Sequence, residues 1–474
     1  MNQQTENGRA NTLTAVVLDH LERTNFESLP DAAVQRAKTR LLDAVGLISA
    51  GARATGSQEL LSLVLGWGGR PEATALTTRT RVPAAQAALT NAVLMRSYDF
   101  EPVGADRSDG HQIPAHITGT TAAVALAVAE RESSTGAQTL HALICADDLA
   151  ARLGHAVGFD VYGGGDNTGT INVVGGTVVA GLLMGLRRDQ FRHALGLAIN
   201  QTAGTIQNIF DKTTAFKLPI GLSARNAVFS AELAAAGWTG PLDPFGARFG
   251  FLNQWSRDPD PERITAGLGE EYFADAVIKP WPSCRASQPS LDAAVQLVQQ
   301  HRLKPDDIAR AVVHVPERTA AGFVGQPFQV GEVPEVSAAF SIEFAVATAL
   351  QHGTVRLEHL TEEHMVDPCF AGMLGRVSIV GDLSPDSDHS AELEVHLHSG
   401  RKLQVGVSTA RGDISFAPLT ALEVEQKFRR SIAWAAGADR QQEAQSLLET
   451  LTDFEQLEDI TVIGNALADL QAAR

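Results

Sequence analysis

Apolar residues recur at helical spacing along most of the first half of the chain. Leu13, Val16, Val17 and Leu21 follow the i, i+3, i+4, i+8 pattern of a helix with one buried face. The segment 119–130 is rich in alanine and apolar on nearly every side, which is typical of a helix buried all round whose small side chains allow close packing. Further helices are expected over residues 34–47, 83–95, 140–153, 173–186, 191–199 and 223–237.

Strand patterns follow from about residue 273 onward. The run 311–316 is β-branched and ends at a proline, and residues 375–381 have the same character. Residues 391–407 alternate apolar and polar positions on both sides of Ser399-Gly400, which predicts a β-hairpin.

Helical spacing returns at Leu419, where Thr420 and Glu423 have the spacing of a capping box, and residues 441–470 are helical again. A tail without strand signals is expected to pack back onto the first helical region. We therefore predict a mainly α protein with a large discontinuous all-helical domain, residues 1–272 and 413–474, and a smaller α+β lid domain, residues 273–412.

Composition narrows the function classes. The chain has 474 residues, of which 44% are hydrophobic, and this content is enough to form a core and excludes a disordered polypeptide. Its 38 basic and 55 acidic residues give a net charge of −17, which repels phosphate backbones and anionic lipid, so we expect no nucleic-acid partner and no membrane partner. Three separated cysteines, no signal-peptide pattern and no membrane-length apolar run predict a cytoplasmic protein without a thiolate zinc site.

A polar stretch, residues 98–119, leads directly into the alanine-rich helix. Some of its four carboxylates and two histidines could form an acid/base cluster at the start of that helix; an ordinary surface loop is the alternative. His116 stands out because a loop against a buried helix N-terminus is rarely fully solvated, and the helix dipole there favours anionic ligands.

Two other segments could contribute to an anion pocket. The glycine-rich run 163–170 lacks the Lys-Ser/Thr end of a Walker motif, so we reject a nucleotide site there and keep a backbone-rich pocket wall. In residues 279–285, two prolines stiffen the backbone that carries Lys279 and Arg285, and arginine can bind a carboxylate through two N–H groups. A domain-crossing linker with surface charges is the alternative for this segment.

Four more basic positions are assigned to surfaces when each is considered alone. Lys217 lies in an apolar stretch, where a lysine usually extends its ammonium to water. His396 and His398 share one face of the predicted hairpin, with His389 beside it. No third metal ligand follows at a recognisable spacing, so these histidines are interpreted as strand surface.

Taken together, these segments resemble the MmgE/PrpD family, which includes 2-methylcitrate dehydratases, cis-aconitate decarboxylases and iminodisuccinate epimerase. The landmarks are, in chain order, Asp99-Phe100, His116-Ile-Thr-Gly, Thr168-Gly-Thr, Lys217 to Gly221, Lys279-Pro-Trp-Pro-Ser-Cys-Arg285 and Glu423 to Lys427-Phe-Arg. The resemblance implies the discontinuous helical domain and α+β lid, a homodimer, neither metal nor organic cofactor, and a small anionic di- or tricarboxylate as substrate.

Carried over position by position, the resemblance also implies site residues. Catalytic roles fall to Asp99, His116, Lys217 and Cys284, and substrate-binding roles to Lys279, Arg285, Thr168 and Gln288. The chain also departs from the family pattern. Cys284 and Gln288 stand where relatives carry histidines, Asp166 replaces another histidine, and Phe344 replaces a tyrosine.

The resulting hypothesis is a cofactor-independent lyase, of the dehydratase or decarboxylase type, that moves a proton next to a carboxylate. His116 would carry the proton, and Asp99 would orient the His116 imidazole. Lys217, Lys279 and Arg285 would bind the carboxylates of the substrate. If Cys284 acts as a second proton carrier, the same site would make an epimerase, and a ligand-binding relative without catalysis is the third alternative. All three require His116 to share one cavity with Lys279 and Arg285.

Overall fold

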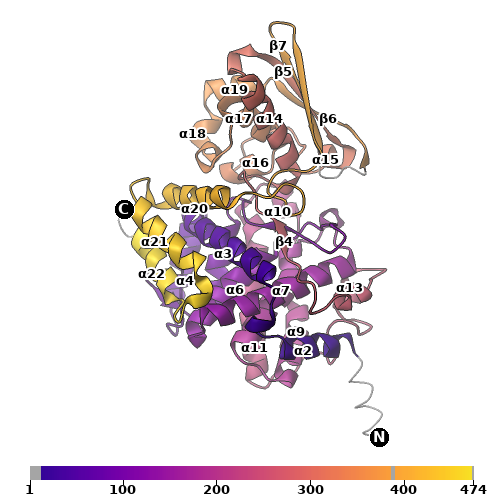
Figure 1. Ribbon diagram of the computed structural model, residues 1–474, viewed down its shortest axis with the longest axis vertical. Coiled ribbons are helices and arrows are strands. Elements are labelled where there is room, and N and C mark those ends of the chain that lie inside the picture. Colours follow the sequence, from indigo (N-terminus) through magenta and orange to yellow (C-terminus); the bar gives the residue numbers. More distant parts are fainter. Residues whose placement is uncertain (1–11, 386–389, 472–474) are drawn as a thin grey trace.

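The computed structural model describes residues 12–385 and 390–471, and it confirms the mainly helical class. A large helical body carries a smaller lobe that contains a four-stranded sheet and its helices (Figure 1). We call the elements α2–α13 with α20–α22 the helical body, and the elements α14–α19 with β5–β8 the lid. The domain boundaries expected after residues 272 and 412 stay predictions.

Twelve helices make up the first part of the helical body within the described residues. They are α2 (Leu13–Arg23), α3 (Asp31–Gly51), α4 (Ser57–Trp67), α5 (Ala84–Arg96), α6 (Ile117–Glu132), α7 (Gly136–Val157), α8 (Ile171–Leu183), α9 (Arg188–Ala198), α10 (Gln207–Phe210), α11 (Leu218–Ala235), α12 (Phe251–Trp255) and α13 (Glu262–Thr265). Two short antiparallel pairs accompany them: β1 (Ala73–Thr74) with β2 (Arg81–Val82), and β3 (Val103–Ala105) with β4 (Asp275–Val277).

Helix α6 forms the centre of this body. Every residue from Ile117 to Glu130 is buried, as the alanine-rich sequence predicts, and the helix packs against α5, α7, α8 and α11. Small residues permit this density. A Cβ atom at Gly221 of α11 would lie 2.5 Å from Val93 Cγ2 of α5, so only glycine allows the two helices to approach this closely.

The lid confirms the strand predictions. Its strands are β5 (Ile308–Pro316), β6 (Val377–Leu383), β7 (Ala391–Leu397) and β8 (Lys402–Val407), in the order β6-β5-β7-β8. Strand β5 runs parallel to β6 and antiparallel to β7, and the expected hairpin pairs Leu393 with Val405. The lid helices are α14 (Gln288–His301), α15 (Glu317–Ala321), α16 (Pro334–Ala339), α17 (Ile342–His352), α18 (Glu362–Met365) and α19 (Pro368–Leu374).

The hairpin histidines lie at the sheet surface. His396 on β7 is half-buried beside Arg310, whose Nη2 lies 3.0 Å from His396 Nε2, and His398 is exposed. His389 lies outside the described residues.

Helices α20 (Ala421–Ala436), α21 (Gln441–Thr452) and α22 (Thr461–Gln471) return to the helical body. The capping box of Thr420 and Glu423 starts α20 as the spacing predicts. Helix α20 packs on α3, and Lys427 Nζ lies 2.7 Å from Asp43 Oδ1 in that buried contact. The C-terminal segment therefore closes over one side of the first helices.

Over the same two described ranges, no helix is both long enough and apolar enough to span a membrane.

Candidate active site

The site begins where α5 ends. Arg96 is the last residue of α5, and three residues later Asp99 adopts a left-handed backbone conformation with φ of +49°. Positive φ is uncommon outside glycine, although aspartate tolerates it, and it concentrates at functional sites where the surrounding structure enforces it. Here the turn brings the carboxylates of Asp99 and Glu101 onto the guanidinium of Arg96, which donates hydrogen bonds to both.

Pairing between strands brings Lys279 to the same place. Val103 of β3 pairs with Val277 of β4, and this pairing positions Lys279, two residues further on, beside the turn after α5. The Lys279 side chain is fully buried, its Nζ lies 3.0 Å from Asp99 Oδ2, and it also donates to the Asp99 carbonyl oxygen. Lys279 therefore fixes both the side chain and the unusual backbone of Asp99.

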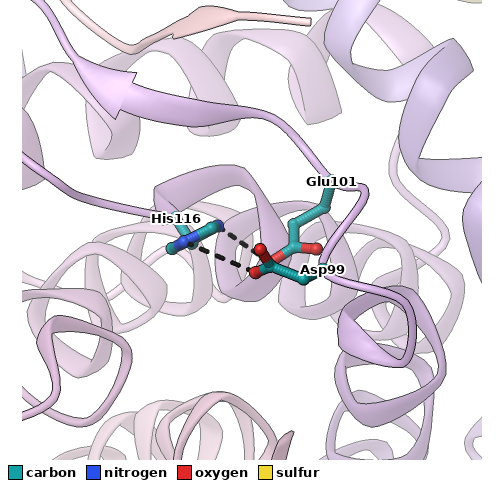
Figure 2. A group of neighbouring side chains, drawn as sticks. All are labelled: Asp99, Glu101 and His116. Atoms are coloured by element: carbon teal, nitrogen blue, oxygen red, sulfur yellow. Dashed lines mark ion pairs between the residues drawn. The ribbon is translucent and has the colours of Figure 1, made fainter. Parts of the chain in front are cut away.

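His116 completes the cluster from the other side. It immediately precedes α6, and its carbonyl oxygen accepts a hydrogen bond from Asn172 Nδ2 at 2.7 Å. Its Nδ1 lies 2.8 Å from Glu101 Oε1, whereas its Nε2 lies 3.9 Å from Asp99 Oδ1, beyond hydrogen-bond distance (Figure 2). Arg96 Nη1 lies 3.3 Å from each ring nitrogen, within hydrogen-bond distance of both.

Burial and charge determine the protonation of this cluster. Burial lowers the pKa of His116, and the Arg96 charge lowers it further, so the ring is neutral at pH 7. Burial alone would raise the pKa of Glu101, but the charge of Arg96 and the hydrogen bond with His116 outweigh it and hold that pKa well below its usual range. A neutral ring beside a carboxylate donates its Nδ1–H to Glu101, which leaves Nε2 as the unprotonated nitrogen of the ring, 3.3 Å from Arg96 Nη1.

The same three residues are the one group of possible metal ligands in the part of the chain that the structure describes. Ligand atoms of Asp99, Glu101 and His116 lie within 4.8 Å of one another. Arg96 already donates to both carboxylates, and Lys279 to one of them. A divalent cation would have to displace these buried positive charges, so the donor set fits an acid/base cluster better than a metal centre.

His116 faces a cavity of about 700 Å³ between the helical body and the lid. Asp99 and His116 line it from one side, and Cys284 and Arg285 line it from the segment that follows β4. The expected meeting of the loop histidine with Arg285 in one hollow is thus present in the structure. Lys279 is not part of the lining. It lies behind Asp99 and holds the Asp99 carboxylate in place.

Arg285 and Cys284 present different chemistry to the cavity. Arg285 Nη2 lies 3.4 Å from Asp413 Oδ2, and its Nη1 has no hydrogen-bond partner among the described residues. Burial raises the pKa of Cys284 to about 12, so its side chain is a thiol at neutral pH. The cavity therefore offers a guanidinium with one open edge and a thiol that can donate a proton.

Three other predicted residues lie outside the lining. Lys217 Nζ donates to Thr55 O at 2.7 Å, and Thr168 Oγ1 donates to Asp166 Oδ1 at 2.7 Å. Gln288 Nε2 donates to the carbonyl oxygens of Trp281 and Ser283, at 3.1 and 2.9 Å. Each supports a segment near the cavity. Phe344 packs in the lid between Phe328 and Phe370, also away from the lining.

The buried position of Lys217 has a measurable consequence for stability. Burial lowers the pKa of Lys217 to about 8, from an ordinary value of 10.5. Between these pH values the unfolded chain binds more protons than the folded chain, so this lysine makes stability rise with pH across the window. Urea unfolding of Lys217→Met should lack that part of the rise, while the exposed Lys304→Met should retain it. Parallel curves for wild type and Lys217→Met between pH 8 and 10.5 would refute this placement of Lys217.

Sequence reasoning missed Arg96, Asn167, Arg318 and Asp413, all of which line the cavity. Arg96 had a detectable signal, because it is the only charged residue in the segment 84–96 and lies three positions before Asp99. Asp413 and Arg318 had none, since their partners, Arg285 and Asp160, are more than a hundred residues away along the chain.

Comparison with known proteins gives two family matches and two curated relatives. The MmgE/PrpD N-terminal domain matches residues 17–264, and the MmgE/PrpD C-terminal domain matches residues 281–453. A cis-aconitate decarboxylase of Aspergillus terreus strain NIH 2624 / FGSC A1156 is 21% identical over 309 residues, 63% of each chain. A cis-aconitate decarboxylase of Aspergillus terreus is 21% identical over 292 residues, 60% of this chain and 59% of the relative. The chain thus spans about three fifths of the length of these relatives.

Proposed function

The chain belongs to the MmgE/PrpD family, and from this membership and the geometry of the site we propose that it is a lyase that removes a proton next to the carboxylate of a small organic acid. The observation that carries the proposal is that His116, whose Nδ1 is held by Glu101, lines the same cavity as Arg285. The names of the relatives support the lyase class, since both are cis-aconitate decarboxylases.

Each residue has a defined part in the proposed reaction. Arg285 binds the substrate carboxylate through its open edge, and His116 Nε2 accepts the proton from the adjacent carbon. Glu101 holds the ring and stabilises the positive charge that forms on it, because its carboxylate accepts the Nδ1–H at 2.8 Å. Asp99, Arg96 and Lys279 are positioning residues that hold this arrangement rigid.

The protonation states favour dehydration among the lyase reactions. A neutral imidazole begins by accepting a proton, as the loss of water from a hydroxy acid requires, whereas decarboxylation ends by consuming one. In dehydration the C–H electron pair forms the double bond, and the hydroxyl leaves as water after taking a proton. The His116 imidazolium formed by the first transfer can supply that proton, whereas burial raises the pKa of Cys284 to about 12 and makes its thiol a weak acid.

An epimerase is the second candidate, and the Cys284 thiol is the observation that favours it. A base on one face of a carbon and an acid on the other would return a proton with inverted configuration, and both groups line this cavity. The expected homodimer and the cytoplasmic location remain predictions.

An exchange experiment in heavy water tests the proposal. The protein is incubated in D₂O with a panel of hydroxy acids and unsaturated acids, and products are followed by NMR and mass spectrometry. Loss or addition of water with deuterium at the carbon next to the carboxylate supports the dehydratase, and loss of carbon dioxide supports the decarboxylase alternative. Deuterium uptake with inversion and no net loss supports the epimerase. No exchange with any acid that binds would contradict an enzymatic role.

A further inference from the structure

The cations on the cavity wall are already paired with carboxylates. Among the described lining residues, the cations are Arg96, Arg285 and Arg318, and the carboxylates are Asp99, Asp160, Asp166 and Asp413. Arg96 is bound by Asp99, Arg318 pairs with Asp160, and Arg285 lies beside Asp413. The three arginine charges on this wall therefore face four carboxylates.

The balance of charge on the cavity wall limits how many ligand carboxylates the cavity can bind. Each carboxylate that leaves water needs a positive partner, because an unpaired buried charge is strongly destabilising. Among the lining cations in the described ranges, Arg96 Nε and Arg285 Nη1 are buried N–H groups without an acceptor. The charge of Arg96 is already compensated by the carboxylates of Asp99 and Glu101, whereas Arg285 lies beside Asp413 alone and its side chain is 11% exposed. The wall therefore accommodates one carboxylate well and offers no matching cations for three.

Another part of the cavity wall is apolar and aromatic. Phe323 of the lid lies at its centre, with ring centroids 5.6 Å from Tyr162, 5.6 Å from Phe210 and 5.7 Å from Phe340. Ile206 and Ile209 of the helical body extend this surface into the cavity. We call Tyr162, Ile206, Ile209, Phe323 and Phe340 the aromatic wall.

The size of the cavity agrees with a ligand that has one carboxylate and one apolar arm. A volume of about 700 Å³ lies within the range of clefts that enclose whole drug-sized ligands, ~300–1,000 Å³. A compact six-carbon tricarboxylate would fill only a small part of it, and would leave the aromatic wall in contact with water. A ligand with an apolar arm would cover that wall and gain the free energy of burying it.

We propose that the substrate is a 3-hydroxy monocarboxylic acid with an alkyl or aryl arm, or the corresponding 2-enoic acid, whose carboxylate binds Arg285 and whose arm packs on the aromatic wall. The inference rests on the proposed dehydration and narrows its substrate. The C2–H proton goes to His116 Nε2, the C2–C3 double bond forms, and the C3 hydroxyl takes a proton from the His116 imidazolium and leaves as water. Atoms and electrons balance without any oxidant or reductant.

A comparison of three acids tests the inference. Dissociation constants of the full-length protein are measured by calorimetry for 3-hydroxy-3-phenylpropanoate, 3-hydroxybutanoate and cis-aconitate. The aryl acid should bind about tenfold more tightly than 3-hydroxybutanoate, because its ring is removed from water, and cis-aconitate should bind more weakly than either. Binding of cis-aconitate as tight as that of the aryl acid would overturn the inference.

Substitutions distinguish a specific effect of the aromatic wall on binding from a general loss of stability. Phe323→Ala should remove most of the preference for the aryl arm while changing the affinity for 3-hydroxybutanoate little, and Phe323→Leu replaces it if the alanine variant does not fold. Phe370→Ala is the matched control, since Phe370 is a fully buried lid aromatic outside the cavity lining. An unchanged preference in both Phe323 variants would refute the role of the wall.

Deuterium exchange distinguishes this inference from the proposed function. If the acids bind in the expected order but none gains deuterium at C2, the dehydration is wrong and the binding mode stands. If cis-aconitate is turned over in preference to both monocarboxylates, the lyase stands and the inferred substrate is wrong.

Discussion

Replacing His116 with glutamine is expected to lower kcat by about 10²–10⁴-fold, the usual contribution of a positioned acid/base group. Glutamine can still donate a hydrogen bond toward Glu101, whose charge also stays paired with Arg96, so the fold should be preserved. The loss follows because no other neutral base in the cluster faces the cavity: Glu101 is engaged by Arg96, and Asp99 by Arg96 and Lys279.

The measurement is steady-state turnover of whichever acid shows exchange, together with circular dichroism to check the fold. His314→Gln is the matched control, because His314 lies on β5 beside Asp382, on the lid sheet and outside the cavity lining. A His116→Gln enzyme that is correctly folded and retains wild-type turnover would remove His116 from the reaction.

Replacing Arg96 with methionine is expected to destabilise the protein by about 3–5 kcal/mol, the usual cost of removing one partner from a buried ion pair. Arg96 donates to both Asp99 and Glu101, and all three side chains are buried. Lys279 still compensates Asp99, so the uncompensated charge falls on Glu101. The pKa of His116 should then rise, because the Arg96 charge no longer opposes its protonation.

Urea unfolding measures this effect, and a second substitution checks its cause. Because Arg96→Met leaves the Glu101 charge without its main partner, the double variant Arg96→Met/Glu101→Gln should recover part of the lost stability. Arg79→Met is the control, since Arg79 pairs with Asp469 at the exposed surface and such pairs contribute about 0–1 kcal/mol. Equal losses for the single and double variants would show that the charge on Glu101 is not the cause.

The sequence predicted those parts of the fold that depend on local patterns. The buried helix α6, the β7–β8 hairpin and the capping box of Thr420 each follow from residues close together in the chain. The pairing of β3 with β4 was not predicted, because strands of three residues carry little periodicity and their partners lie about 170 positions apart. That pairing is what brings Lys279 to Asp99.

The sequence indicated several of the residues at the candidate site, but it did not indicate which partners each of them has. Asp99, His116, Cys284 and Arg285 do meet at one cavity. Lys217 and Lys279 carry the charge that a carboxylate pocket needs, but the folded chain engages both ammonium groups internally, at Thr55 and Asp99. Sequence shows where a charge lies along the chain but not which acceptor it finds after folding, and that partner decides whether it is available to a substrate.

The protonation state of His116 at pH 7 tests the proposed chemistry most directly, and it requires no substrate. Ring ¹⁵N chemical shifts of histidine-labelled protein, assigned by difference from His116→Gln, report which nitrogen carries the proton. The structure predicts a neutral ring protonated at Nδ1, with a midpoint below 6.5. An imidazolium at pH 7, or a neutral ring protonated at Nε2, would contradict the assignment of His116 as the base.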